Sequence, residues 1–588
     1  MLLACKVICH AQQVKPILER TLNISFSNER TDVALSKISQ AAGFNFSYNP
    51  SILDPSKKIT FNFKNAPVRE ILNTIFNGKI SFKERKGYLI LQPVKYVEKP
   101  ATQPESFVYS GYVRDEEGQP LPWVSIYDRS SLESTVSNDY GFYRIRFAEK
   151  QLPLTLYFSK QGFIDTAVNL VPASPGFINL QLKKRIVVST PVTDFDSLAL
   201  SAENTAGSFF TRLNEEPNAL NIDDTLYRKY QASVLPYIGT NLKLSGNVIN
   251  DYSINLFGGI GMGVQKAELA GLFNINKTNV KYVQVAGFFN LNGGATEGVQ
   301  VAGFTNVVRG DVKGLQIAGF VNLDWSNSEG FLLAGFVNTV KGKSEGLQMA
   351  GFVNSTLDSM EGVQVAGFCN VTYRGMKGTQ ISGGCNVVVD TLIGTQLGLI
   401  NYAYHIKGSQ VGLLNFSKST NGIPIGMVSY VNDGYHKLEL SADEIFPVNL
   451  AIRTGVNAFH NIITSGMDPF SGDSLHWNFG YGIGTSIQLS QNTFLDFDVT
   501  SSQIVKGNIV DKINLLNKVY LGVDIRLAKK ISLATGLTLN GHLYKTNYDF
   551  YPEIFSWYEP NIFYNHTWIQ DNTRLDMWLG AKVALRFF

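Results

Sequence analysis

One ten-residue phrase recurs along the middle of the chain, and its spacing restricts the folds that the chain can adopt. Residues 313–322 read KGLQIAGFVN, and close copies end at Asn306 and Asn354. The step between copies is 16 residues, as from Gly287 to Gly303. The glycine and asparagine framework consists of Gly287, Asn290, Gly303, Asn306, Gly319, Asn322, Gly335, Asn338, Gly351, Asn354, Gly367 and Asn370. Constant spacing over this many copies indicates a repeat architecture.

Residue alternation within each copy predicts a β-strand with two different faces. One face carries Leu315, Ile317, Gly319, Val321 and Leu323, and the other carries Gln316, Ala318, Phe320 and Asn322. Charged residues lie between the copies, so each repeat divides into a strand of about ten residues and a turn of about six. Because 16 is even, every copy places the same residues on the same face.

Two folds satisfy this pattern. In an antiparallel meander each copy is one membrane strand, and its apolar face contacts lipid. In a β-solenoid the copies stack in parallel, the apolar face fills a core, and Asn and Gln form ladders. Turns of constant length favour the solenoid, whereas the membrane-length strand favours the meander. We expect the meander.

Two cysteines distinguish these folds, because Cys369 and Cys385 occupy the same slot in successive copies. Stacked solenoid strands lie about 4.8 Å apart, which a disulfide can span. In the meander the two positions are offset by four residues, or roughly 13 Å, which is too far. The meander therefore predicts two free thiols, and a bond between them would indicate the solenoid.

The segment 433–588 contains alternating stretches that are typical of outer-membrane barrel strands. In the last, Leu579, Ala581, Val583, Leu585 and Phe587 share one face, and Lys582 and Arg586 share the other. A soluble sandwich strand could show the same alternation. The chain end resembles the terminal-strand signal that the barrel assembly machinery reads, and its residues are Gly580, Val583, Leu585, Phe587 and Phe588. Phrases such as GVQVAGF and GYGIGTSI resemble a group of repeat-containing, uncharacterised outer-membrane β-barrel proteins of Gram-negative bacteria, which implies a location but no activity.

Residues 14–92 predict a small α+β module. Val33, Leu35, Ile38 and Ala41 have helical spacing, and Pro67 opens a second helix. The phrases ALSKISQAAGFNFSYNP and KNAPVREILNTIF resemble the Secretin and TonB N-terminus short domain. This resemblance implies a periplasmic module that contacts another protein, such as an anti-sigma type regulator. A simple spacer is the alternative.

A Pro-rich linker, 93–106, leads to a predicted β-sandwich at 107–184. The pattern of that segment resembles the carboxypeptidase regulatory-like domain, a non-catalytic adapter, and is carried by Gly111, Val113, Asp115, Gly118, Pro120, Leu121, Thr135, Gly141 and Tyr143. Residues 185–240 are predicted to form a connector, and 241–432 the repeat region.

Residues 1–11 resemble a signal peptide that is cleaved near Ala11. Lipidation of Cys5 and no processing are the alternatives. A truncated start would explain why the basic region of a signal peptide is missing.

Composition excludes several classes of function. Net charge is +3 and 17% of residues are charged, which does not suit a nucleic-acid partner. No apolar run reaches the length of a transmembrane helix, and the spacing of His and Cys suggests neither a metal site nor a cofactor.

The sequence therefore predicts a mainly all-β chain: a small α+β domain, a sandwich adapter, a repeat region (alternatively a solenoid) and a C-terminal outer-membrane-type barrel. We expect a non-enzymatic protein of the outer membrane with periplasmic interaction domains, which couples or signals through a periplasmic partner. An outer-membrane porin or transport protein is the alternative.

Overall fold

The computed structural model describes residues 15–54, 57–93, 106–148, 154–170, 176–185, 217–471, 475–506, 513–547 and 559–588. The chain is mainly β, with a solenoid-like stack and a closed eight-stranded barrel, so the predicted fold class is confirmed. Two compact units, Met1–Gly263 and Val264–Phe588, are described separately below. The predicted signal segment, Cys5 and the linker interior lie outside the described residues.

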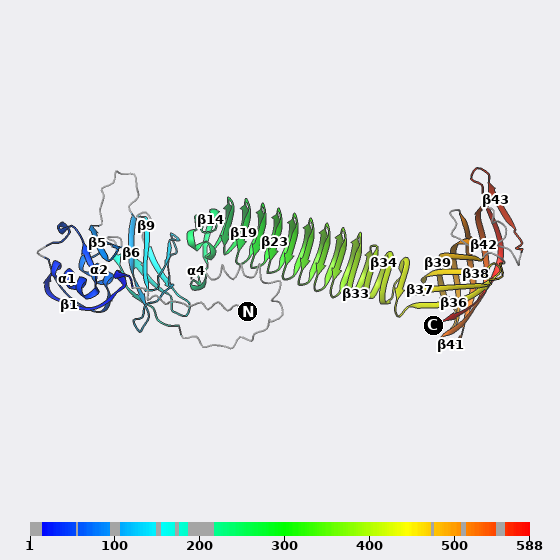
Figure 1. The fold of residues 1–588 in the computed structure, drawn as a ribbon, viewed down its shortest axis with the longest axis horizontal. Coiled ribbons are helices and arrows are strands. Elements are labelled where there is room, and N and C mark those ends of the chain that lie inside the picture. The colour runs from blue at the N-terminus through cyan, green and yellow to red at the C-terminus, as the bar shows by residue number, and fades with distance from the viewer. Residues whose placement is uncertain are drawn as a thin grey trace, which may run out of the picture. The chain divides into compact units, whose positions relative to one another are not determined.

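Unit 1 begins with an α+β module (blue in Figure 1). Strands β1 (Thr21–Arg30) and β3 (Lys58–Pro67) pair antiparallel, and a second sheet has the order β2 (Asn45–Ser47), β5 (Tyr88–Pro93), β4 (Ile80–Arg85). Helices α1 (Thr31–Ala42) and α2 (Val68–Phe76) carry much of the core, and α1 ends at Gly43 with a φ of +67°. The first helix buries Ala34, Leu35, Ile38 and Ala42. Of the residues predicted from helical spacing, Leu35 and Ile38 are buried, whereas Val33 and Ala41 are exposed.

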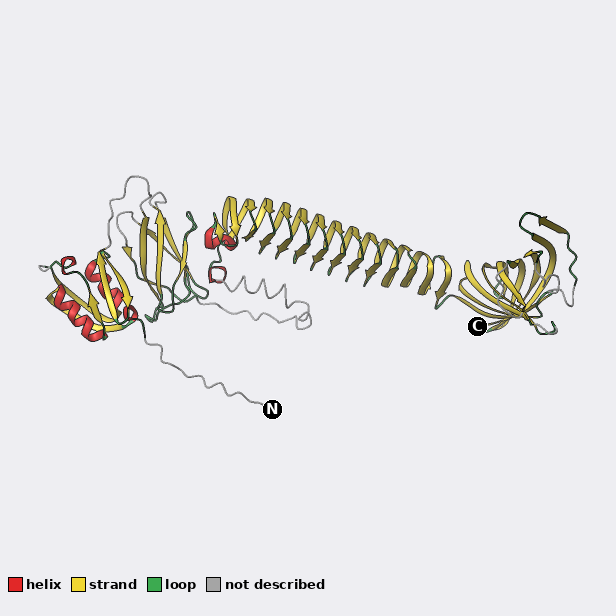
Figure 2. Cartoon of the chain, turned by 45° about the horizontal axis from the view of Figure 1, so that its top comes forward, coloured by secondary structure: helices red, strands yellow, loops and turns green. Residues whose placement is uncertain are grey.

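A second module in unit 1 consists of two small sheets packed around one core (Figure 2). One sheet has the order β11 (Thr166–Leu170), β10 (Leu154–Ser159), β7 (Ser125–Asp128), β8 (Ser134–Val136). In the other, β6 (Ser106–Arg114) pairs with β9 (Phe142–Ala148), β12 (Gly176–Phe177) and β13 (Leu180–Gln181). The two modules touch, since Tyr112 donates a 2.9 Å hydrogen bond to buried Glu19 and Arg114 pairs with Glu70 at 2.8 Å.

The last part of unit 1 is a short helix, α4 (Pro217–Asn221), and four strands. They are β14 (Leu226–Leu235), β15 (Ile238–Gly239), β16 (Val248–Asn255) and β17 (Gly258–Gly261). Strands β14 and β16 pair in parallel, with Leu226 opposite Val248.

Unit 2 begins with a β-solenoid in which each 16-residue coil contributes a long and a short strand. The long strands are β18 (Gly263–Ala270), β20 (Val280–Ala286), β22 (Thr296–Ala302), β24 (Val312–Ala318), β26 (Ser328–Ala334), β28 (Ser344–Ala350), β30 (Met360–Ala366) and β32 (Met376–Ser382). The short strands are β19 (Phe273–Asn276), β21 (Phe289–Asn292), β23 (Thr305–Val308), β25 (Val321–Asp324), β27 (Val337–Val340), β29 (Val353–Thr356) and β31 (Cys369–Thr372). Strands β33 (Cys385–Leu397), β34 (Ile400–Thr420) and β35 (Pro424–Val431) complete the stack.

Successive coils pair in parallel and in register, so our expectation of an antiparallel meander is wrong. Gln300 lies opposite Gln316, and Asn306 lies opposite Asn322. In-register pairing places equivalent residues of neighbouring copies side by side. The Asn position of the repeat thereby forms a continuous ladder, whereas the Gln ladder is interrupted at Leu332.

The solenoid interior is lined with carboxamides. Asn322 and Gln316 are fully buried. The Asn322 amide donates to the Asn338 side-chain oxygen at 2.9 Å and to the Leu333 carbonyl at 2.8 Å, and Gln316 donates to the Gln300 oxygen at 2.9 Å. Each coil thus provides partners for buried amide N–H groups of its neighbour, which removes much of the cost of burying them. The Gln316 side-chain oxygen, next to Leu332, has no hydrogen-bond partner among the described residues.

The apolar face predicted for each copy lies outward instead of filling a core, which corrects the solenoid alternative in this respect. Other apolar side chains, such as Val312 and Ala318, are buried together with the amides. Leu315, Ile317, Val321 and Leu323 are only partly buried. Alternation stops at the bend formed by Gly319 and Phe320, so Phe320 also faces outward and is 38% exposed. The prediction of Phe320 on the amide face is wrong, because it treats each copy as one unbroken strand in which residues alternate between the two faces.

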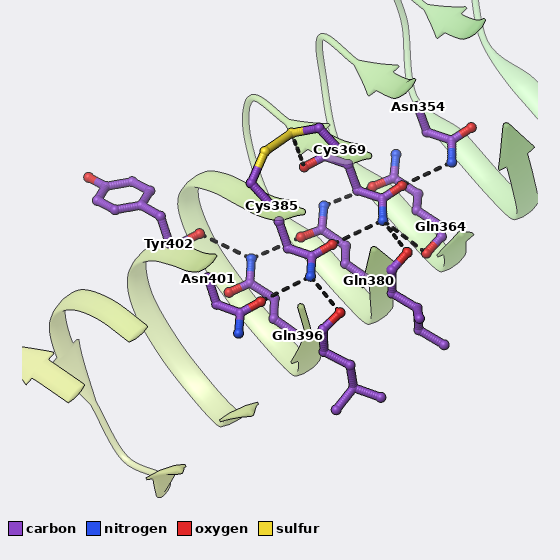
Figure 3. The surroundings of a disulfide bond; sticks show 12 residues. Asn354, Gln364, Cys369, Gln380, Cys385, Gln396, Asn401 and Tyr402 are labelled. Carbon is purple, nitrogen blue, oxygen red and sulfur yellow. Dashed lines mark hydrogen bonds between the residues drawn. A yellow bond between two sulfur atoms is a disulfide. The ribbon is translucent and has the colours of Figure 1, made fainter. Parts of the chain in front are cut away.

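The two cysteines are bonded to each other. Cys369 and Cys385 are in-register partners of adjacent coils with Cα atoms 4.7 Å apart, and they form a disulfide (Figure 3). The predicted pair of free thiols is therefore wrong, for the same reason that the meander is wrong: the strands are stacked in parallel and not offset.

The rest of unit 2 is an antiparallel barrel. Its strands are β36 (Tyr435–Asp443), β37 (Val448–Val456), β38 (Phe459–Asp468), β39 (His476–Gln488), β40 (Thr493–Lys506), β41 (Asn514–Ala528), β42 (Ile531–Lys545) and β44 (Thr573–Phe587). Because β36 pairs with both β37 and β44, the sheet closes. A further strand, β43 (Tyr564–Trp568), adds to β44.

Asp324 makes the stability of the solenoid depend on pH. It is fully buried between Val308 and Val340, accepts one 3.0 Å hydrogen bond from Gln316, and its other oxygen has no hydrogen-bond partner among the described residues. Burial raises the pKa of this carboxyl to about 7. The folded chain therefore keeps the proton at pH values where the unfolded chain has lost it.

We expect the stability of the solenoid to fall as pH rises from about 4 to about 7, by up to about 4 kcal/mol at 1.36 kcal/mol per pKa unit. Asp324→Asn removes this slope, and Asn276 and Asn292 already occupy the same slot in other coils. Urea unfolding of both proteins across this range measures the effect. A slope that is equal in the two proteins would contradict the assignment.

Candidate functional site: the outer face and the interior of the barrel

The outer face of the barrel is mainly apolar. On β37, Leu450 and Ile452 point outward and are about half exposed, whereas Asn449 and Arg453 on either side of them and Ala451 between them are buried. The same alternation on the other strands exposes Leu440, Phe479, Ile483, Ile487, Phe497, Val499, Leu521, Ile525, Leu537, Leu579, Val583 and Leu585. A soluble protein rarely leaves so large a continuous apolar surface uncovered.

The residues of the predicted terminal signal lie on β44 and just after it. Val583 and Leu585 face outward, Phe587 is half-buried, and Phe588 is exposed. Gly580 has another role, because a Cβ atom there would lie 2.1 Å from a carboxylate oxygen of Glu444. The position therefore requires the smallest residue for an interior contact.

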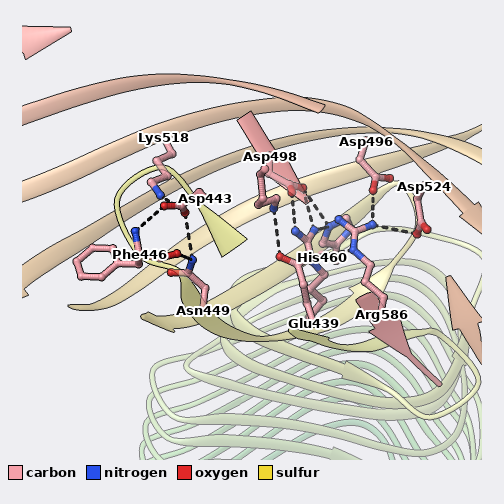
Figure 4. Close-up of polar contacts among 12 residues, drawn as sticks. Glu439, Asp443, Phe446, Asn449, His460, Asp496, Asp498, Lys518, Asp524 and Arg586 are labelled. Carbon is pink, nitrogen blue, oxygen red and sulfur yellow. Dashed lines mark hydrogen bonds and ion pairs between the residues drawn. The ribbon is translucent and has the colours of Figure 1, made fainter. Parts of the chain in front are cut away.

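Arg453 lies at the centre of a buried ion-pair network inside the barrel. Figure 4 shows its partners Glu439 and Asp498. Its guanidinium donates to Asp498 at 2.6 and 3.0 Å and to Glu439 at 2.8 Å. His460, which is also fully buried, lies 3.1 Å from the same guanidinium. Such bidentate, charge-assisted contacts are the strong ones, and they hold strands β36, β37 and β40 together across the interior.

A second arginine extends the network to the terminal strand. Arg586 donates to Glu439 at 2.8 Å and to Asp524 at 2.9 Å, and it also pairs with Asp496. Lys582 donates to the other oxygen of Glu439 at 3.1 Å. Three cations and four carboxylates thus fill the middle of the barrel, and the seven groups largely neutralise one another.

The end of the barrel beyond β36 is closed by the short turn to β37. Asp443 accepts hydrogen bonds from the backbone N–H groups of Ile445 and Phe446 and pairs with Lys518. Ile445 and Phe446 are buried against Trp578. Glu444 also points inward, and its carboxylate accepts from the Trp578 indole at 3.1 Å.

At the opposite end the barrel contacts the last coil of the solenoid. Asn461 donates to the Gly426 carbonyl at 2.5 Å and accepts from the Ser429 N–H at 2.8 Å. Thr454 donates to the Ser429 carbonyl at 2.9 Å. Polar groups at the edge of strand β35 thus find partners in the barrel, and the barrel caps the open edge that a parallel stack would otherwise expose.

The interior network is not among the features predicted from the sequence. A signal for it was present in TFLDFDVTSS, where Asp496 and Asp498 alternate with outward Phe497. Carboxylates at every second position of a strand with apolar residues between them indicate a charged interior. The matching arginines lie on other strands, and no local pattern pairs them.

No protein-family model and no curated protein matches the chain. Within the described residues there is no cluster of His, Cys, Asp and Glu side chains that could hold a metal ion. No helix in that part of the chain is long and apolar enough to cross a membrane.

Replacing Arg453 with Met should strongly destabilise the barrel. The change leaves Glu439 and Asp498 buried with fewer cations, and breaking a buried pair from one side typically costs about 3–5 kcal/mol. Lys530→Met, at an exposed turn, is the matched control. We expect the folded, heat-modifiable band on a semi-native gel to disappear at lower temperature for Arg453→Met alone. Equal behaviour of the two variants would mean that the network adds little stability.

Proposed function

We propose that the chain is a non-enzymatic outer-membrane protein in which the barrel anchors a periplasmic solenoid and periplasmic interaction modules. One observation carries this proposal: the barrel is apolar outside and ionic inside, which is the reverse of a soluble protein. Lipid is the solvent that suits such a surface, because charge on the outer face is costly there while charge in the interior is not.

Strand length and connection length support a membrane-spanning barrel. Strands β41, β42 and β44 are each 15 residues long, more than the 9–11 residues that a tilted span requires. Short turns join β37 to β38 and β41 to β42, at the end where β36 begins and β44 finishes. Longer connections join β38 to β39 and β40 to β41 at the other end. Since outer-membrane barrels have short periplasmic turns, the solenoid belongs on the periplasmic side.

The filled interior favours an anchor over the alternative, a porin or transport protein. The ion-pair network occupies the middle of the barrel, and Ile445 and Phe446 close one end. Porins of larger strand number leave an aqueous channel, whereas eight strands enclose a space that side chains can fill.

The N-terminal modules are proposed to bind a periplasmic protein. Resemblance to the Secretin and TonB N-terminus short domain supports this role, and an anti-sigma type regulator is the kind of partner that it implies. The contact between Tyr112 and Glu19 supports a role for the second module as a rigid adapter for the first. The terminal residues of β44 are proposed as the signal for the barrel assembly machinery.

Conductance tests the anchor against the porin. We expect the purified full chain, reconstituted in a planar bilayer, to show no steady ion conductance, because its interior is filled. A porin of larger strand number, reconstituted in the same way, shows that the method detects an open channel. Steady single-channel currents from the unaltered chain would contradict the anchor and favour the porin.

A further inference from the structure

A groove without a single polar side chain crosses four coils of the solenoid. It has a volume of about 600 Å³ and lies on β24, β26, β28 and β30. Its lining is repetitive: one aliphatic or Met side chain, one Ala and, in three of the coils, one Gly. The lining residues are Ile317, Ala318, Leu333, Ala334, Gly335, Met349, Ala350, Gly351, Val365, Ala366 and Gly367.

The floor of the groove is kept free of side chains by the packing of the coils. A Cβ atom on Gly335 would lie 2.1 Å from the Gly319 carbonyl oxygen, and one on Gly351 would lie 2.1 Å from that of Gly335. No larger residue fits without moving the backbone. Stacking at the 16-residue repeat therefore keeps the groove open along these four coils.

Aromatic rings stand directly after the floor residues in each coil. Phe320, Phe336 and Phe352 stack with centroids 4.8 and 4.9 Å apart, and each ring is about two fifths exposed. On the other flank, Leu333 and Met349 are in-register partners that form an aliphatic ridge. The apolar surface thus extends beyond the groove on the side of the phenylalanine rings.

The lining chemistry selects the occupant. Backbone N–H groups at the floor are already used between coils, as from Gly335 to the Ala318 carbonyl at 3.1 Å and from Gly351 to the Ala334 carbonyl at 3.2 Å. A peptide lying here would give up hydrogen bonds to water and find no replacement, at a cost of roughly 1–3 kcal/mol per group. A hydrocarbon chain loses nothing and gains the burial of its surface.

We propose that this groove binds the acyl chain of a lipid. The groove is straight and repeats with the coil spacing of about 4.8 Å, so a linear chain fits in any longitudinal register. The charged residues of the coils, such as Lys313 and Glu329, pair with each other along the turn edge and leave the groove unobstructed. The solenoid would then bind a lipid, in addition to its proposed role as a module that the barrel anchors.

Photo-cross-linking of the full chain in growing cells tests the proposal. A benzophenone amino acid replaces Met349 in the groove or, as the matched control, exposed Glu345 on the same strand β28. We expect adducts with the mass of a phospholipid or lipopolysaccharide at position 349 and at least about tenfold fewer at position 345.

Every other outcome overturns the proposal. An adduct of twice the chain mass would assign the groove to a second copy, and an adduct with another protein would assign it to a protein partner. If no adduct is enriched at position 349, the proposal that the groove binds an acyl chain is wrong.

A charged variant provides a second readout. Leu333→Glu puts a carboxylate on the groove wall, and Phe331→Glu puts one on the same strand outside the groove lining. We expect the first to reduce lipid adducts at position 349 at least about tenfold and the second to leave them unchanged. Formation of the Cys369–Cys385 disulfide in both variants reports that the stack has folded. Equal adduct yields in the two variants would contradict binding in the groove.

Discussion

A buried carboxamide is costly unless both its N–H groups and its oxygen find partners, and the solenoid supplies most of these partners by repetition. Asn306, Asn322 and Asn338 each donate to the next asparagine along the stack. No single coil could satisfy its own amides, so the interior is stable only as a stack of in-register copies. The 16-residue period, the parallel pairing and the outward position of the apolar side chains all depend on this constraint.

Both parts of unit 2 have the same inverted distribution of polarity. In the solenoid, Asn and Gln are inside while Phe320 and Ile317 are outside. In the barrel, Arg453 and Asp498 are inside while Leu450 and Ile452 are outside. The interior interactions differ in kind, since the solenoid uses neutral hydrogen bonds between identical residues and the barrel uses ion pairs between strands far apart in the sequence.

This inversion also determines how much the sequence could predict. Alternation on β44 correctly separates Val583 and Leu585 from Lys582 and Arg586, because a regular strand has one period throughout. The repeat was harder. Its apolar face is predicted either to contact lipid in a meander or to fill a solenoid core. The strands form a solenoid instead of a meander, and this face lies on the outside of it. A bend at Gly319 and Phe320 ends the alternation within each copy. The amides are stable inside only because neighbouring coils supply their hydrogen-bond partners, and no single repeat contains these partners.

The ion-pair network could not be predicted from the sequence for a related reason. Arg453 and Asp498 are 45 residues apart and meet only when the barrel closes.

In-register parallel stacking is the central claim, and engineered disulfides test it most directly. In a chain with Cys369 and Cys385 both replaced by Ser, Val337→Cys and Val353→Cys place thiols at in-register partners, whereas Val337→Cys and Ser355→Cys are offset by two residues, or about 7 Å. Peptide mass spectrometry after mild oxidation should find a bond in the first pair and free thiols in the second. Free thiols in the first pair, or equal bonding in both, would contradict the stacked amide ladders.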